Sequence, residues 1–241
     1  METVITNKDV ILTGVYEVDR ELGGGIPVGS LVLIEGQSGT GKSALCQYLA
    51  YNTLLFNEDA VAYYATDNSI KGLVKQMDSM SLNSLDYLLT DKFRIYPLNS
   101  QNGYRATRES LILLVSHLTK LSERFKLVII DSMTILMNHI SPVSQLDFFS
   151  ICRNICERGR TILLVADSRS FEKGMISRLH SLCDDHISFR SEEVGNRLIK
   201  LLAALKLRGA DYPARAGVSF EILPDTGIRV LPYSKVNATP R

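Results

Sequence analysis

A glycine-rich loop near the start of the chain constrains the fold more than any other segment. Its eight residues are Gly36, Gln37, Ser38, Gly39, Thr40, Gly41, Lys42 and Ser43, and they match the phosphate-loop pattern of Gly, four residues and Gly-Lys-Ser. The apolar run Leu31–Glu35 before the loop predicts a buried strand, and the good helix formers over Ser43–Phe56 after it predict a helix. A strand, a glycine turn and a helix in this order predict an α/β fold that binds phosphate.

The residue types of the loop predict which phosphate compound binds. Glycines let the backbone N–H groups converge on an anion, and the following helix points its positive end at it. Lys42 can reach the β- and γ-phosphates, and the Ser43 hydroxyl can coordinate Mg²⁺. The sequence therefore predicts a nucleotide with β- and γ-phosphates, bound together with Mg²⁺.

Strand and helix patterns alternate up to residue 167. Short apolar runs predict further strands at Val61–Thr66, Phe93–Leu98, Leu127–Asp131 and Thr161–Asp167. Helical patterns lie between them, at residues 69–90, in the stripe Leu111–Leu121 and over Leu146–Cys156. This alternation predicts a mostly parallel central sheet with helices on both faces. Pro97 places the Phe93–Leu98 strand near a sheet edge.

The last quarter of the chain has a different pattern. His186–Ser191, Val218–Leu223 and Ile228–Leu231 resemble strands joined by short turns. Leu198–Leu207 is rich in Leu and Ala, which favours a helix, but its position among short strands favours a strand, and we predict a strand. The sequence thus predicts a C-terminal antiparallel extension. Because no linker or internal repeat is visible, we expect residues 1–241 to form a single domain.

Two carboxylates are candidates for the chemistry of the bound nucleotide. Asp131 ends a predicted parallel strand, where a carboxylate faces the ligand crevice and can hold a Mg²⁺-bound water. Asp67 and Asn68 follow another strand, near the position where hydrolysing proteins of this type carry a Glu that acts as base. Aspartate is shorter than glutamate, and Asn cannot accept a proton. We therefore expect Asp67 to be at most a slow base, with weak or absent ATP hydrolysis.

Two cations near residue 207 have two interpretations. If a strand ends here, Lys206 and Arg208 project on the same face. They could complete the γ-phosphate site of a neighbouring subunit, as an arginine finger does. Alternatively, they form a solvated basic edge that prevents further strand pairing. The spacing alone leaves both interpretations open.

Composition limits the partners and the compartment. The 27 Lys and Arg against 26 Asp and Glu give a net charge of +1, which argues against a protein built around nucleic acid. We expect neither a transmembrane helix nor a signal peptide. Cysteine and histidine can bind metals, but we expect the four cysteines to be buried core residues in a reducing compartment. We expect two of the histidines to be ordinary surface or core residues. These residues are Cys46, Cys152, Cys156, Cys183, His139 and His180.

Several segments together resemble the KaiC-like branch of the RecA superfamily. The general segments are the lead-in Val18–Ile26, the phosphate loop, Leu127–Ser132 and Lys206–Gly209. More specific segments resemble the FlaH (ArlH) family of archaellum nucleotide-binding proteins, and they are Arg94–Asn99, Val128–Leu136, Phe171–Arg178 and Asp225–Pro232.

This resemblance implies a RecA-like ATP-binding regulatory subunit of the archaeal flagellum motor. It implies that ATP and Mg²⁺ binding promotes assembly, expected to be homo-hexameric, and docking to the hexameric motor ATPase FlaI, with little hydrolysis. It also implies a cytoplasmic position beneath the membrane platform protein FlaJ. Asp67 and Asn68 stand where KaiC-like ATPases often carry paired Glu. The alternative function is a KaiC-like or recombinase-like ATPase that hydrolyses ATP and acts on DNA.

Overall fold

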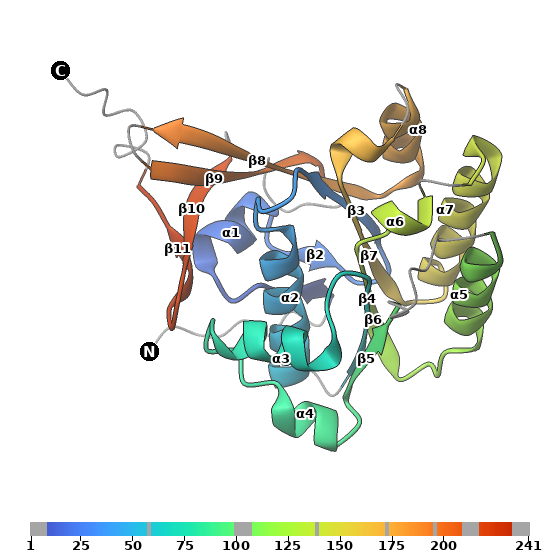
Figure 1. Cartoon of the computed structure of the whole chain (residues 1–241), viewed down its shortest axis with the longest axis horizontal. Helices are drawn as coiled ribbons and strands as arrows, with labels where there is room; N and C mark the ends of the chain where they lie inside the picture. Colours follow the sequence, from blue (N-terminus) through green and yellow to red (C-terminus); the bar gives the residue numbers. More distant parts are fainter. Residues whose placement is uncertain are drawn as a thin grey trace.

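A computed structural model describes residues 9–56, 59–98, 108–137, 140–171, 174–194, 197–208 and 217–232. Within these ranges the chain forms a nine-stranded sheet in the order β11-β10-β9-β8-β3-β7-β6-β4-β5 (Figure 1). The mutually parallel strands are β3 (Leu31–Gly36), β4 (Ala60–Ala65), β5 (Phe93–Pro97), β6 (Phe125–Asp131), β7 (Thr161–Ala166) and β8 (Asp185–Val194). The antiparallel strands are β9 (Arg197–Lys206), β10 (Val218–Leu223) and β11 (Gly227–Val230).

Helices cover both faces of the sheet and enclose two separate cores. The helices on the first face are α1 (Tyr16–Glu21), α2 (Lys42–Phe56), α3 (Ile70–Asp78) and α4 (Leu85–Leu89). Those on the second face are α5 (Arg108–Lys120), α6 (Thr134–Met137), α7 (Pro142–Cys156) and α8 (Met175–Leu182). Figure 1 shows these two groups on opposite sides of the central strands. The predicted α/β class, with helices on both faces, is confirmed.

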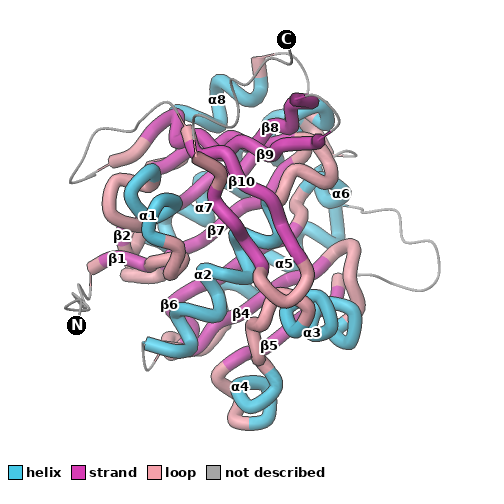
Figure 2. The backbone as a smooth tube through the Cα atoms, turned by 90° about the vertical axis from the view of Figure 1, so that its left-hand side faces the viewer, coloured by secondary structure: helices cyan, strands magenta, loops and turns pink. Residues whose placement is uncertain are grey.

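The antiparallel extension is also confirmed, and it includes the ambiguous segment. β9 pairs with β8 on one side and β10 on the other, so strand hydrogen bonds override the helix propensity of its Leu and Ala residues. Figure 2 shows β9 and β10 crossing the molecule beside β8. β5 pairs only with β4 and forms the edge of the sheet, as Pro97 predicted.

The prediction for residues 69–90 requires a correction. The segment forms two helices, not one, because α3 ends at Asp78 and α4 begins at Leu85. Ser81 lies between them with a φ of 62°, a left-handed conformation that no helix accommodates. The short helices α1, α6 and α8, the 3₁₀ turn η1 (Ser168–Ser170) and the two-residue pair of β1 (Val10–Ile11) and β2 (Ile26–Pro27) were not predicted.

The expectations for cysteines are confirmed where the structure tests them. All four cysteines are buried and unpaired, as small core residues are. His139 lies outside the described residues, and His180 is half-buried on α8. In the described part of the chain, each helix is too short or too polar to cross a membrane.

Candidate nucleotide-binding site

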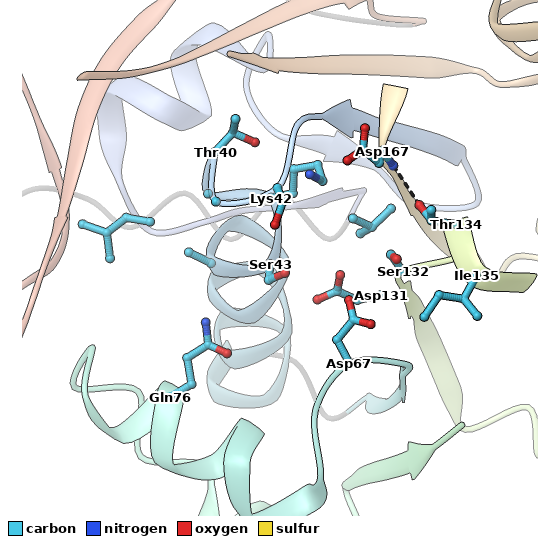
Figure 3. A pocket seen from close by; sticks show the side chains of 16 residues that line it. Thr40, Lys42, Ser43, Asp67, Gln76, Asp131, Ser132, Thr134, Ile135 and Asp167 are labelled. Carbon is cyan, nitrogen blue, oxygen red and sulfur yellow. Dashed lines mark hydrogen bonds between the residues drawn. The ribbon is translucent and has the colours of Figure 1, made fainter. Parts of the chain in front are cut away.

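A pocket of about 380 Å³ opens at the carboxyl edge of the parallel strands. The phosphate loop and the first turn of α2 form one wall, and residues following β4, β6 and β7 form the other (Figure 3). Its lining residues beyond the loop and α2 are Asp67, Gln76, Asp131, Ser132, Thr134, Ile135, Val165, Asp167 and Ile222. This volume is within the usual range for a small-molecule site. The topology therefore places Asp67 and Asp131 in one pocket with the loop.

Two glycines of the loop lie where a side chain would not fit. A Cβ atom on Gly36 would lie 2.4 Å from the Phe189 carbonyl oxygen, and one on Gly41 would lie 3.0 Å from Cζ of Phe220. Both glycines also have positive φ angles, 150° and 106°. The loop thus packs directly against β8 and β10, so the C-terminal strands support it from behind.

Lys42 holds its ammonium group inside the loop. Its Nζ donates hydrogen bonds to the carbonyl oxygens of Gly36 at 2.7 Å and Gln37 at 2.6 Å. Burial lowers the pKa of Lys42, whereas the carboxylates of Asp167 and Asp131 raise it. The ammonium is positioned to exchange its two carbonyl partners for phosphate oxygens.

Asp131 lies at the end of β6, beside the first turn of α2. The Tyr63 hydroxyl donates a 2.5 Å hydrogen bond to its Oδ2, and the Ser43 hydroxyl is also hydrogen-bonded to this carboxylate. Burial raises the pKa of Asp131, and the Asp67 carboxylate also raises it, while the hydrogen bonds from Tyr63 and Ser43 lower it. A carboxylate and a hydroxyl in contact form the oxygen donor set that Mg²⁺ prefers, so the residues fit this ion.

Asp67 lies in the loop after β4, exposed on the pocket wall and close enough to Asp131 to influence its pKa. Figure 3 shows the two carboxylates side by side, with Gln76 of α3 to their left, below Ser43. The Asn68 side chain donates a 3.5 Å hydrogen bond to Gln76. The carboxylate of Asp67 thus faces the space beside the phosphate loop, and its role as a base stays a prediction.

Two further charged residues belong to this region, and sequence reasoning missed both. Asp167 follows β7, lines the pocket and interacts electrostatically with Lys42. Burial tends to raise the pKa of Asp167, but hydrogen bonds from Arg169 lower it overall. Asp167 occupies the same kind of strand-end position that indicated Asp131, so the same argument could have found it. Lys200 of β9 donates a hydrogen bond to the Gly39 carbonyl oxygen, and no local sequence signal indicated that contact.

Lys206 and Arg208 do not line the pocket. Lys206 Nζ donates hydrogen bonds to the carbonyl oxygens of His180, at 2.9 Å, and Cys183. The Arg208 guanidinium donates a 2.7 Å hydrogen bond to Asp184. β9 ends at Lys206, so Arg208 lies beyond the strand, and both side chains contact the segment between α8 and β8. Only Lys206 is therefore a strand residue, but both cations hydrogen-bond to the same stretch of chain, and their role across a subunit interface stays a prediction.

Comparisons with known proteins agree with this fold. The family described as "ATPase: KaiC" matches residues 11–235. "Archaeal flagellar ATP-binding protein FlaH" of Sulfolobus acidocaldarius is 28% identical over 93% of this chain and 98% of its own length. The protein of the same name from Methanocaldococcus jannaschii is 28% identical over 89% of this chain and 91% of its own. The crystal structure of the flagellar accessory protein FlaH from that organism superposes with a TM-score of 0.76 at 25% identity, covering 92% and 98% of the two chains.

Proposed function

This chain belongs to the KaiC family of ATPases, and from that premise we propose that it is an ATP-binding regulatory subunit of an archaeal flagellar motor. Residues 1–241 act as one ATP-binding domain. The pocket carries the proposal. In it the phosphate loop, the oxygen atoms of Ser43 and Asp131, which suit Mg²⁺, and the carboxylate of Asp67 meet at the carboxyl edge of the sheet. The FlaH relatives, named as archaeal flagellar ATP-binding proteins, supply the biological setting.

The loop 36–43 holds the triphosphate by its main chain. Lys42 leaves the carbonyl oxygens of Gly36 and Gln37 and pairs with the β- and γ-phosphates, which are stronger partners because they are charged. Ser43 and Asp131 would hold Mg²⁺, which would neutralise phosphate charge. Replacement of the internal bonds of Lys42 by bonds to ATP makes the loop conformation depend on the nucleotide.

Hydrolysis is slow because Asp67, the candidate base on the pocket wall, has a short side chain. Asp67 has the correct charge but a shorter side chain than Glu, and the neighbouring Asn68 carries no base. A displacement near 1 Å can cost on the order of 100-fold in rate. Occupancy of the site, rather than cleavage, therefore carries the signal.

ATP binding promotes assembly of a homo-hexameric ring and docking to the motor ATPase FlaI, beneath the platform protein FlaJ on the cytoplasmic side. ATP can drive this change only if it binds the docking-competent state more tightly than the other state. Lys206 and Arg208 act across the subunit interface. Their absence from the lining of the chain's own pocket is consistent with this role, since a group that serves a neighbour need not reach its own nucleotide.

Mass measurement of a mixture with FlaI tests the proposal. Light scattering after size-exclusion chromatography should show a complex with FlaI when MgATP is present and much less without it. Lys42→Ala should abolish the ATP effect, and Lys71→Ala, an exposed lysine on α3, should retain it. A complex that forms equally well without nucleotide, or that never forms, would overturn the proposal. Rapid ATP turnover stimulated by DNA would favour the alternative, a recombinase-like ATPase.

A further inference from the structure

A cluster of three metal-ligating side chains lies outside the nucleotide pocket. Glu35 is on β3, His186 on β8 and His180 on α8, and none of them lines the pocket. One carboxylate oxygen and one nitrogen from each imidazole lie within 4.8 Å of one another. Across the described ranges, this is the only group of three or more His, Cys, Asp or Glu side chains that meets this condition.

The sheet register brings these residues together. β3 and β8 are parallel neighbours in which Leu33 is opposite His186 and Glu35 is opposite Ser188. Alternate residues of a strand share a face, so Glu35 and His186 are diagonal neighbours on one face. α8 covers this face through Leu179, which is fully buried in the second core. His180 follows Leu179 and completes the cluster from the helix side.

The polar atoms of the cluster are buried but poorly partnered. His186 is fully buried, and its Nε2 lies 3.2 Å from Glu35 Oε1 without hydrogen-bond geometry. Both ring nitrogens of His186, Oε2 of Glu35 and Nε2 of His180 have no hydrogen-bond partner among the described residues. Buried polar atoms in proteins are normally satisfied. Three side chains that each offer one converging donor atom, with so few hydrogen-bond partners, indicate a ligand that accepts electron pairs.

We propose that Glu35, His180 and His186 bind a divalent transition-metal ion of the Zn²⁺ class, with water as the fourth ligand. Two imidazole nitrogens and one carboxylate oxygen suit Zn²⁺, whereas Mg²⁺ prefers oxygen alone. Tetrahedral Zn²⁺ places its ligand atoms about 3.3 Å apart, so no gap in the cluster needs to close by more than about 1.5 Å. Small side-chain rotations supply that movement.

The Glu35 carboxylate is the ligand on which metal binding depends most, because a cation already lies beside the cluster. The Lys206 ammonium donates hydrogen bonds to the carbonyl oxygens of His180 and Cys183. Its positive charge repels a metal ion bound in the cluster. The carboxylate of Glu35 supplies the compensating negative charge. Burial lowers the pKa of His180, and the neighbouring His186 lowers it further, which keeps the ring in the neutral form that binds metal. The bound ion joins α8 to the strand that leads into the phosphate loop.

Metal titration of chelator-treated protein tests the site. Zn²⁺ is titrated by calorimetry in excess Mg²⁺, which saturates the Asp131 region, and Co²⁺ is followed by its visible absorption. Wild-type protein should bind one ion per chain and develop the intense bands of tetrahedral Co²⁺. Glu35→Gln and His180→Gln should each lower Zn²⁺ affinity by at least about tenfold.

A matched control uses His117→Gln, an exposed histidine on α5 outside the cluster, which should bind Zn²⁺ as wild type does. Circular dichroism establishes that each variant is folded, and Glu35→Gln decides the question if His180→Gln does not fold. Folded wild-type protein that binds no Zn²⁺, or equal affinity in wild type and Glu35→Gln, would overturn the proposal. Because no ATP is present, failure here leaves the proposed function intact.

Discussion

At Asp131, ATP binding and stability make opposite demands. The side chain is partly buried next to Asp67, and this position raises its pKa. Because the pKa of Asp131 is higher in the folded than in the unfolded protein, the protonated side chain stabilises the fold at pH values below its unfolded pKa. This contribution to the free energy of unfolding is lost as the pH rises through the folded pKa. At neutral pH the ionised Asp131 therefore costs stability, although Mg²⁺ binding requires that ionised form.

Asp131→Asn separates these two effects. The amide carries no charge, so the apo protein should melt at a higher temperature than wild type at neutral pH, and the difference should shrink as pH falls. The same substitution should weaken MgATP binding by about tenfold or more, because one charge-assisted contact is lost. Thermal melts across pH and ATP titrations with and without Mg²⁺ measure both effects. A lower melting temperature with unchanged MgATP affinity would contradict the assignment.

Asp67 limits the rate of hydrolysis in this account. Asp67→Glu lengthens the side chain by one methylene toward the pocket, so it should raise steady-state phosphate release, by up to about 100-fold if distance is the main defect. Asp67→Asn serves as the control, since it keeps the size and removes the base. If neither substitution changes turnover, Asp67 is not the base and other parts of the hydrolytic site are missing.

At the scale of elements, the C-terminal strands act as a support for the phosphate loop. Phe189 of β8 and Phe220 of β10 contact the loop where Gly36 and Gly41 leave space. Lys200 of β9 adds a hydrogen bond to the Gly39 carbonyl oxygen. Three C-terminal strands therefore back the phosphate loop and bring a second cation to it.

Lys200→Met tests this contribution. Methionine keeps the length of the side chain and removes its charge, so ATP affinity should fall by several-fold, about 1–2 kcal/mol for one charged hydrogen bond. Lys120→Met, an exposed lysine at the end of α5, should have no effect. Calorimetric titration of both variants gives the comparison, and an unchanged affinity in Lys200→Met would exclude Lys200 from the site.

The elements that the sequence predicts well are those with strong local patterns. Continuous apolar runs such as Leu31–Glu35 and Thr161–Asp167 indicate buried parallel strands, and the glycine loop indicates the site between strand and helix. Short helices such as α6 and α8 were not predicted because a few residues carry too little periodic signal. Lys200 was missed for a different reason, since its contact depends on how antiparallel strands cross the sheet.

At the scale of the whole molecule, the nucleotide pocket and the cations Lys206 and Arg208 lie at different ends of the strands. The pocket lies at the carboxyl ends of the parallel strands, whereas β9 runs back alongside β8 and ends opposite His186, near the amino end of that strand. Lys206 and Arg208 are at this second end. Head-to-tail contacts that join unlike surfaces generate a ring when the rotation between subunits closes, so this separation suits an assembly in which one subunit completes the site of the next.

Arg208→Ala should therefore weaken ATP-dependent assembly and leave ATP binding by the monomer nearly unchanged. The matched control is Arg229→Ala, which removes another exposed arginine that is ion-paired within the chain, to Glu221. Light scattering with and without ATP follows assembly. A normal ring in Arg208→Ala would assign this arginine to the solvated edge of the sheet.

The central claim is that nucleotide occupancy, without cleavage, carries the signal. Calorimetric titration with MgATP, paired with phosphate release from the same preparation, tests it most directly. We predict saturable binding of one ATP per chain, with a dissociation constant on the order of micromolar, turnover far below about 1 s⁻¹, and loss of the heat in Lys42→Ala. Absence of heat with folded wild-type protein, or turnover above about 1 s⁻¹, would contradict the account.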